Sequence, residues 1–171
     1  LDSVYFVNNT FVGNINCSKL PAIDLKTSEE RRGHLTIKNN VFVNKFPGGA
    51  ITVIELLSYD IDYKIYYTPN SPYIIKFHDS NKSLDYMQNM GYDINSYDEK
   101  PIFNNYDWKF SKTESVYLNY DFSIMDGSTS VDNGTQIGLY RTDINGIVRP
   151  QGAGWDIGAF EVTLKEDGQR H

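Results

Sequence analysis

The sequence lacks several features by which a chain is usually assigned to a class. It has one cysteine, Cys17, in 171 residues, which excludes a disulfide framework within the chain and a cysteine-rich zinc site. No apolar run approaches the roughly 20 residues that a membrane-spanning helix needs. Basic residues number 16 against 22 acidic ones, and the net charge of -6 argues against a nucleic-acid partner, because phosphate binding requires a basic surface.

The amino terminus also lacks an initiator methionine and the basic segment of a signal peptide. The sequence VYFV at positions 4–7 is typical of a β-strand, and a bare strand at a terminus invites other chains to pair with it. We therefore interpret the chain as a mature or truncated product, the C-terminal part of something longer. A boundary that was chosen artificially is the alternative.

What the sequence does contain is a repeat. Residues 4–14 read VYFVNNTFVGN, and residues 35–45 read LTIKNNVFVNK, 31 positions later. Residues 59–69, YDIDYKIYYTP, follow after a further 24 positions. A second register runs between these segments and links residues 22–24, 50–52 and 73–75.

Each repeat therefore contains at least two short strands separated by turns rich in Asn and Gly, and helical spacing is absent from it. Two strands in every 24–31 residues, with like residues above like, predict an all-β fold of the parallel β-helix type. An antiparallel sandwich is the alternative, but it does not require the same dipeptide to return at the same point of each unit.

Particular side chains have expected places in such a stack of coils. Asn9 and Asn40 suit the turns, because Asn tolerates left-handed backbone angles and can stack its amide between coils. Phe11, Phe42 and Tyr66 share one repeat position and are expected to form an internal aromatic stack.

Five stretches carry a resemblance to a known family: NNVFVN (39–44), DYKIYY (62–67), MGYDINSYDEKPIF (90–103), SIMDGS (123–128) and DINGIVRPQGAGWDIGAFE (143–161). The chain resembles the C-terminal end of bacterial right-handed parallel β-helix proteins, of the kind found in polysaccharide lyases and related surface proteins. In that family the last stretch typically marks the final coil. The resemblance implies a right-handed solenoid, a secreted or cell-surface location, and a polysaccharide or cell-surface glycan as partner. It is a resemblance of fold, which proteins with different activities share.

We expect one domain over residues 1–162, which includes the terminal capping motif, followed by a flexible tail at 163–171. A short helix near residues 83–91 decorates the coils. Ser83 can cap this helix, Leu84, Met87 and Met90 share a face, and Gly91 ends it.

Two carboxylates are candidates for glycosidase chemistry. Asp60 and Asp62 stand two apart on a strand-like run, so their side chains point to one face, roughly 6.5–7 Å apart. Inverting glycosidases separate their carboxyl groups by about 6.5–9.5 Å. The alternative is an ordinary position on the surface of a coil.

A lyase reaction requires a cation to neutralise a uronate carboxylate and a base to take the adjacent proton. Lys38 and Lys64 lie about one coil apart and are expected to project from the same sheet. Either lysine is otherwise simply solvated. Further candidates for the cation or base are His34, His78 and Arg141.

One loop has the beginnings of a calcium site. Asp143 and Asn145 place two side-chain oxygens before Gly146, but calcium needs six to eight oxygens in all, and no EF-hand Glu follows. The alternative is an Asx-type turn, with Arg149 hydrogen-bonded to Asp156 or Glu161 as a clamp on the last coil. Calcium is the one candidate cofactor.

Aromatic side chains can stack on sugar rings. The candidates on the repeats and beyond them are Tyr59, Tyr63, Tyr67 and Trp108, together with Tyr73. Trp155 stands within the closing motif and is expected to be packed instead.

Three functions remain open. The first is a non-catalytic, carbohydrate-facing or structural C-terminal segment of an extracellular β-helix protein. The second is a polysaccharide lyase or glycoside hydrolase whose site lies partly in this chain. The third is an adhesin-like module that binds another protein. In every case we expect preceding coils or a second copy of the chain to cover the open end near residues 4–12.

Overall fold

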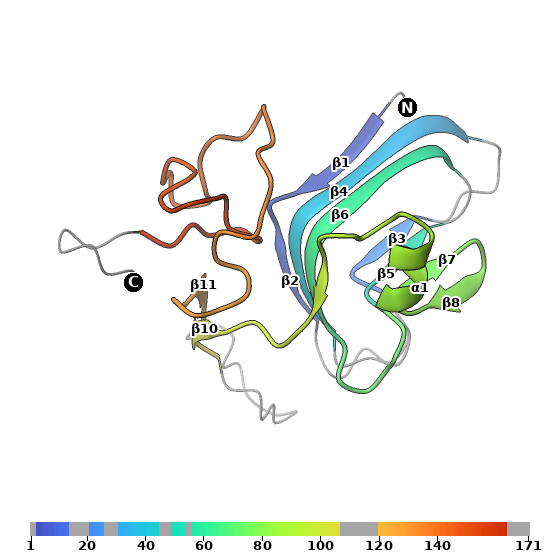
Figure 1. Cartoon of the computed structure of the whole chain (residues 1–171), viewed down its shortest axis with the longest axis horizontal. Helices are drawn as coiled ribbons and strands as arrows, with labels where there is room; N and C mark the ends of the chain where they lie inside the picture. The colour runs from blue at the N-terminus through green and yellow to red at the C-terminus, as the bar shows by residue number, and fades with distance from the viewer. Residues whose placement is uncertain are drawn as a thin grey trace.

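The computed structural model describes residues 3–13, 21–25, 31–44, 49–53, 56–106 and 120–163. Strands make up most of its regular structure, and two of its sheets contain parallel neighbours (Figure 1). The predicted all-β class is therefore confirmed. Cys17, Trp108 and the tail beyond residue 163 lie outside the described residues. Among those residues, no helix is long and apolar enough to cross a membrane.

The larger sheet has the order β1 (Ser3–Val7), β4 (Arg31–Val43), β6 (Leu56–Tyr67) and β9 (Tyr97–Asp98). All its neighbours are parallel, and β2 (Thr10–Val12) pairs with the later part of β4. Val4 is the partner of Leu35, and Leu35 is the partner of Tyr59. These pairs reproduce the offsets of 31 and 24 positions in the sequence repeat, so the predicted register of this sheet is confirmed.

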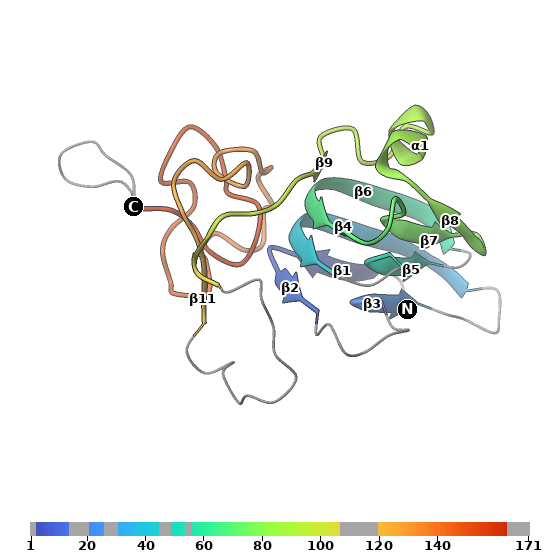
Figure 2. The same ribbon diagram turned by 90° about the horizontal axis from the view of Figure 1, so that it is seen from below.

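The strands of the second sheet lie, in the sequence, between strands of the first. It contains β3 (Ile23–Leu25), β5 (Ile51–Val53) and β7 (Ile75–Phe77) in parallel, with β8 (Ser80–Lys82) antiparallel to β7. The chain thus alternates between the two sheets from β1 to β7. Figure 2 shows the strands of one sheet stacked next to those of the other.

The predicted register of this second sheet is wrong by one residue at its last step. Ile51 pairs with Ile75, whereas the sequence alignment placed it over Ile74. Both isoleucines are buried, at 1% exposure for Ile74 and 0% for Ile75. Two adjacent buried residues remove the in-out alternation that fixes register, so the sequence did not distinguish them.

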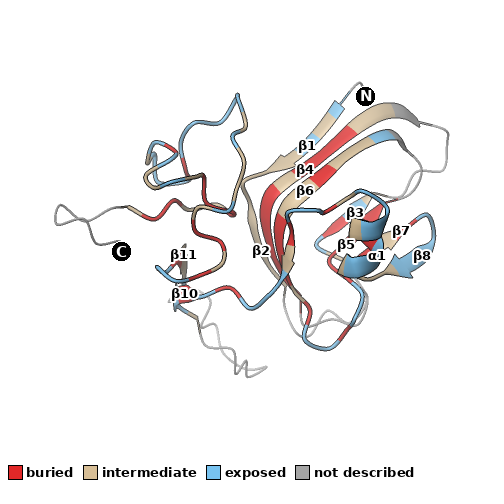
Figure 3. Ribbon diagram, viewed as in Figure 1, coloured by how far each residue is buried: buried red, intermediate tan, exposed pale blue. Residues whose placement is uncertain are grey.

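The main core lies between the two sheets, and Figure 3 shows its buried residues along the middle of β4 and β6. Phe11 stacks on Phe42 at a centroid distance of 5.0 Å, and Phe42 stacks on Tyr66 at 5.6 Å. The expected aromatic stack is therefore confirmed. Each ring contact contributes about 0.5–1.5 kcal/mol beyond the burial of its area.

A corner bends the strands of the larger sheet at one position in each repeat. Asn8, Asn39 and Tyr63 have φ angles of 57°, 53° and 54°, in the left-handed region. The amide ladder stands one residue later, where Asn9 Nδ2 donates to Asn40 Oδ1 at 3.0 Å. The two tasks that the sequence assigned to the same asparagines are thus divided between adjacent ones.

The predicted short helix is present as α1 (Leu84–Asn89). Ser83 Oγ accepts a hydrogen bond from the Tyr86 backbone N–H, and Gly91 follows with a φ of 86°. Met87 is fully buried and attaches the helix to the core, but Met90 is 56% exposed. The apolar face therefore ends earlier than the sequence predicted, because Met90 already serves as the C-cap.

The remainder of the chain leaves the parallel sheets. β10 (Phe103–Asn105) and β11 (Asp121–Ile124) form an antiparallel pair, and residues 125–163 continue as turns beside the corner of the larger sheet (Figure 1). The closing motif at 143–161 adds no strand to either parallel sheet within the described residues. Its frequent Gly, Asp and Asn residues favour turns over strands.

Candidate binding site

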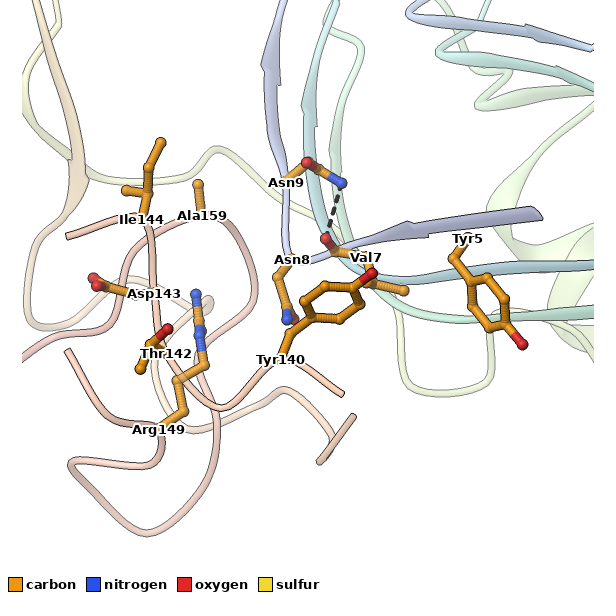
Figure 4. A pocket seen from close by; sticks show the side chains of 10 residues that line it. All are labelled: Tyr5, Val7, Asn8, Asn9, Tyr140, Thr142, Asp143, Ile144, Arg149 and Ala159. Carbon is orange, nitrogen blue, oxygen red and sulfur yellow. Dashed lines mark hydrogen bonds between the residues drawn. The ribbon is translucent and has the colours of Figure 1, made fainter. Parts of the chain in front are cut away.

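A cavity of about 500 Å³ lies between the corner of β1 and the C-terminal turns (Figure 4). Alternation along β1 places Tyr5 and Val7 on the same face of that strand. The opposite wall comes from residues 140–159, which the corner holds in place, since Gly158 N donates to Asn39 O at 2.9 Å. The lining residues are Tyr5, Val7, Asn8, Asn9, Tyr140, Thr142, Asp143, Ile144, Arg149 and Ala159.

Two tyrosines from distant parts of the chain border this cavity. Tyr5 is 52% exposed on β1, and Tyr140 is 51% exposed on a turn whose backbone N–H donates to Ile137 O. Figure 4 shows the rings of Tyr140 and Tyr5 on either side of the Val7 side chain, with Asn8 beside Tyr140. A tyrosine combines an apolar ring with a hydroxyl, which suits contact with a ligand that is itself part apolar and part polar.

Asp143 lies at the edge of the cavity and is occupied by backbone donors. Its Oδ1 accepts from the N–H groups of Asn145 and Ile147, both at 2.8 Å, and its Oδ2 accepts from Glu161 N at 3.0 Å. These contacts describe an Asx-type turn. A calcium ion would have to displace them, and no group of three acidic, His or Cys side chains in the described residues could hold a metal ion. The Asp143 and Asn145 pair therefore does not fit calcium.

Arg149 ties residues 156–161 together through its hydrogen bonds. Its guanidinium donates to Asp156 O at 2.9 Å, Glu161 Oε2 at 2.9 Å and Gly158 O at 2.8 Å. Both members of the Arg149–Glu161 ion pair are almost completely buried. Burial raises the pKa of Glu161 and lowers the pKa of Arg149, which its carboxylate neighbours partly offset.

Asp156, which lies next to Arg149 and Glu161, binds backbone N–H groups. The Asp156 carboxylate accepts hydrogen bonds from Asp132 N at 2.8 Å and Val162 N at 2.6 Å. Burial raises the pKa of this carboxyl group, although the two backbone donors oppose the shift. Trp155 is 5% exposed beside Arg149 and is packed, as expected.

The two glycosidase candidates stand elsewhere, on the outer face of β6. Asp60 forms an ion pair with Lys38 at 2.7 Å, and both side chains are partly exposed. Asp62 accepts from the backbone and side chain of Asn95 at 2.7 and 2.8 Å, and from Tyr63 N at 2.9 Å. Both carboxylates thus have structural partners, and neither is among the residues that line the cavity.

Lys64 does not project from the same surface as Lys38, which corrects the expectation from the sequence. The side chain of Lys64 is completely buried and forms an ion pair with the equally buried Asp93. Burial lowers the pKa of Lys64, while the Asp93 carboxylate opposes that shift. The left-handed residue Tyr63 interrupts the in-out alternation of β6, so the next side chain points inward.

The other predicted ligand contacts also lie away from the cavity. Tyr59 packs against Phe77 at 5.1 Å, Tyr63 forms the bend of β6, and Tyr67 packs on a smaller core cluster. Sequence reasoning missed Tyr5 and Tyr140. Tyr5 belongs to an ordinary strand pattern, and Tyr140 belongs to no repeat or motif, so the sequence contains no signal that distinguishes either residue.

The remaining candidates for a cation or base are dispersed. His34 Nδ1 lies 2.8 Å from Ser58 Oγ, and the ring of His78 contacts Phe77. Arg141 is exposed and borders a second cavity of about 500 Å³ with Gln136. The structure brings none of these three together with Lys64.

Comparisons with protein-family models, curated proteins and solved structures found no significant match. The function of this chain is therefore inferred from its own geometry.

Proposed function

We propose that the chain is the C-terminal part of an extracellular right-handed parallel β-helix protein and that it binds polysaccharide without cleaving it. The cavity bordered by Tyr5 and Tyr140 is the proposed binding site. The observation that carries this proposal is that two half-exposed tyrosines, far apart in the sequence, line one cavity of about 500 Å³.

The strand order supports the fold. Parallel strands joined by crossovers between two sheets, with stacked like residues, are what successive coils of a β-helix would produce. The extended surface of such a stack suits a long, repetitive ligand. The right-handed sense of the coils follows the strong preference of parallel crossovers for that hand.

The lining of the cavity supports a sugar ligand. Tyrosine rings can cover the apolar face of a sugar ring, while the exposed Thr142 offers a hydrogen-bonding group for its hydroxyls. Pockets of roughly 300–1,000 Å³ are the usual size for small ligands, so the cavity fits one or two sugar units of a chain.

The interactions of Asp60 and Asp62 support binding without cleavage. A glycosidase needs one carboxylic acid ready to protonate the leaving oxygen and a second carboxylate beside the substrate. Asp60 and Asp62 are engaged by Lys38 and Asn95, on a surface outside the cavity. Lys64, which could have served a lyase, is buried.

Calorimetric titration with neutral hexasaccharides and with oligouronates from pectin and alginate tests this function. We expect at least one of them to bind, and Tyr5→Ala and Tyr140→Ala each to weaken that binding by about tenfold, as the loss of one aromatic contact predicts. Tyr73→Ala is the matched control, because Tyr73 is 41% exposed and lies outside the cavity. No binding, or equal loss in all three variants, would contradict the proposal.

Catalysis is measured on the same samples. We expect no ultraviolet absorbance from unsaturated uronates and no release of reducing ends. Turnover that Asp60→Asn or Lys38→Met abolishes would favour the enzyme instead.

A further inference from the structure

A buried amine meets a buried carboxylate beside β6. Lys64 of β6 and Asp93, which follows α1, are both 0% exposed, and Lys64 Nζ contacts Asp93 Oδ1. This contact does not have the geometry of a hydrogen bond, and Nζ has no hydrogen-bond partner among the described residues. The attraction between two buried ions offsets their loss of hydration only when hydrogen bonds satisfy their remaining donors and acceptors. The Lys64 ammonium lacks such bonds, so the pair is poorly suited to remain ionic.

The backbone holds the two side chains against each other. Asp93 N donates to Ile61 O of β6 at 2.9 Å, and Gln88 Nε2 of α1 donates to Asp93 O at 3.2 Å. On the other side, Lys64 N donates to Ser96 Oγ at 3.0 Å. Figure 2 shows α1 and β9 next to β6, on the side away from β4. Groups that are held in contact in this way react as if their concentration were roughly 10⁵–10⁸ M.

Two hydroxyl groups donate to the same carboxylate. Tyr66 Oη donates to Asp93 Oδ2 at 3.2 Å, and Ser96 Oγ donates to Asp93 Oδ1 at 2.6 Å. Burial raises the pKa of Tyr66 well above 10.0, and Asp93 adds to the shift, so this hydroxyl keeps its proton and remains a donor. Burial lowers the pKa of Lys64, although Asp93 opposes the shift, and this favours the neutral amine, which is the nucleophilic form.

We propose that Lys64 and Asp93 condense to an amide that cross-links β6 to the segment after α1. Lys64 first passes a proton to the Asp93 carboxylate, and the neutral Nζ then attacks Cγ. The Nζ–Cγ bond forms and the Cγ–Oδ1 bond breaks. Oδ1 leaves as water with two of the three ammonium protons, and the third stays on the amide nitrogen. No group is oxidised or reduced, and no other reactant is consumed.

The surrounding groups suit this reaction. Tyr66 donates to Oδ2, where negative charge develops as the amine attacks, and Ser96 donates to the oxygen that leaves. The product is uncharged, so the reaction removes two charges from a site without water contact. The inference is independent of the sugar site, because Lys64 and Asp93 do not line that cavity.

Mass spectrometry of the whole protein under denaturing conditions tests the proposal. We expect the chain to be lighter than its sequence by one water molecule. Lys64→Arg and Asp93→Ala should each have the full mass of their sequence, because a guanidinium does not give up its proton and alanine has no carboxyl group. Lys38→Met is the matched control. It removes the partly exposed cation beside Asp60 and should leave the loss of water unchanged.

A tryptic map of the wild type locates the lost water and does not depend on the folding of any variant. Trypsin does not cleave after an amidated lysine, so the peptides that contain Lys64 and Asp93 should appear as one branched peptide. A cyclised Asp126–Gly127 step would lose the same mass within a single peptide. The peptides of the exposed pair, Lys38 and Asp60, should remain separate.

The rate of the reaction tests the role of the Tyr66 hydroxyl. A chain that is recovered unfolded and unreacted in denaturant should lose water after it refolds on dilution. Tyr66→Phe should slow this loss by about 100-fold, as the removal of one donor to a developing oxyanion predicts, while circular dichroism shows that it folds. Equal rates in wild type and Tyr66→Phe would refute that role.

Three outcomes would overturn the cross-link itself. The first is a wild-type mass equal to that of the sequence. The second is a map in which the peptides of Lys64 and Asp93 are separate. The third is a loss of water that persists in Lys64→Arg.

Discussion

Asn39 and Thr135 exchange two hydrogen bonds across 96 positions of the chain. Asn39 Nδ2 donates to Thr135 O at 2.6 Å, and Thr135 N donates to Asn39 Oδ1 at 2.9 Å. The side-chain amide of Asn39, at the corner of β4, thus binds the backbone of the C-terminal turns as a neighbouring strand would. This pair positions the second wall of the cavity and links the repeat to the segment that follows it.

Replacement of Asn39 should therefore be costly. Asn39→Ala removes the hydrogen bonds to Thr135 and Asn8. It also places alanine at a φ of 53°, a left-handed angle that asparagine adopts more readily. We expect the free energy of unfolding to fall by about 2–4 kcal/mol, measured by chemical denaturation. Asn39→Gly accepts that backbone angle and should cost less. Equal losses would show that the backbone angle contributes nothing.

The Arg149–Glu161 pair should behave as a buried ion pair. Arg149→Met leaves the Glu161 carboxylate buried without its cation and should lower the free energy of unfolding by about 3–5 kcal/mol. Arg149→Met combined with Glu161→Gln should recover part of that loss, because no charge then remains unpaired. Additive losses in a double-mutant cycle would refute a direct coupling between the two groups.

The aromatic stack should contribute through its central ring. Phe42→Ala opens a cavity between Phe11 and Tyr66, and we expect the free energy of unfolding to fall by about 3–5 kcal/mol in urea denaturation. The surface control Ile144→Ala, at a residue that is 70% exposed, should change it by less than about 0.5 kcal/mol. A Phe42→Ala variant as stable as that control would mean that the rings are not packed as described.

Alkaline pH should reveal the environment of Tyr66. Burial raises the pKa of Tyr66 well above 10.0, and Asp93, which accepts its hydrogen bond, adds to the shift. Above pH 10 the unfolded chain loses this proton while the folded chain retains it, so stability falls as the pH rises. The difference in unfolding free energy between wild type and Tyr66→Phe should therefore shrink from about pH 9 to about pH 11.

Much of the parallel architecture was predictable because it is periodic. Each coil buries its neighbour, so the same residue types return at the same position, as Phe11, Phe42 and Tyr66 do. The helix at Leu84–Asn89 was predictable from its cap and its terminating glycine, which are local signals. Prediction failed where the period was ambiguous, at Ile74 and Ile75, since either residue could occupy the buried position.

The sequence by itself determined the repeat, its offsets of 31 and 24 positions, and the residues that stack along it. Only the tertiary structure decided that Lys64 lies inside the core, because the left-handed angle at Tyr63 reverses the side-chain alternation there. It alone also placed Tyr140 and Tyr5 in the lining of one cavity. Contacts between a repeating segment and a non-repeating one have no period in the sequence, and they exist only once the chain has folded back on its own corner.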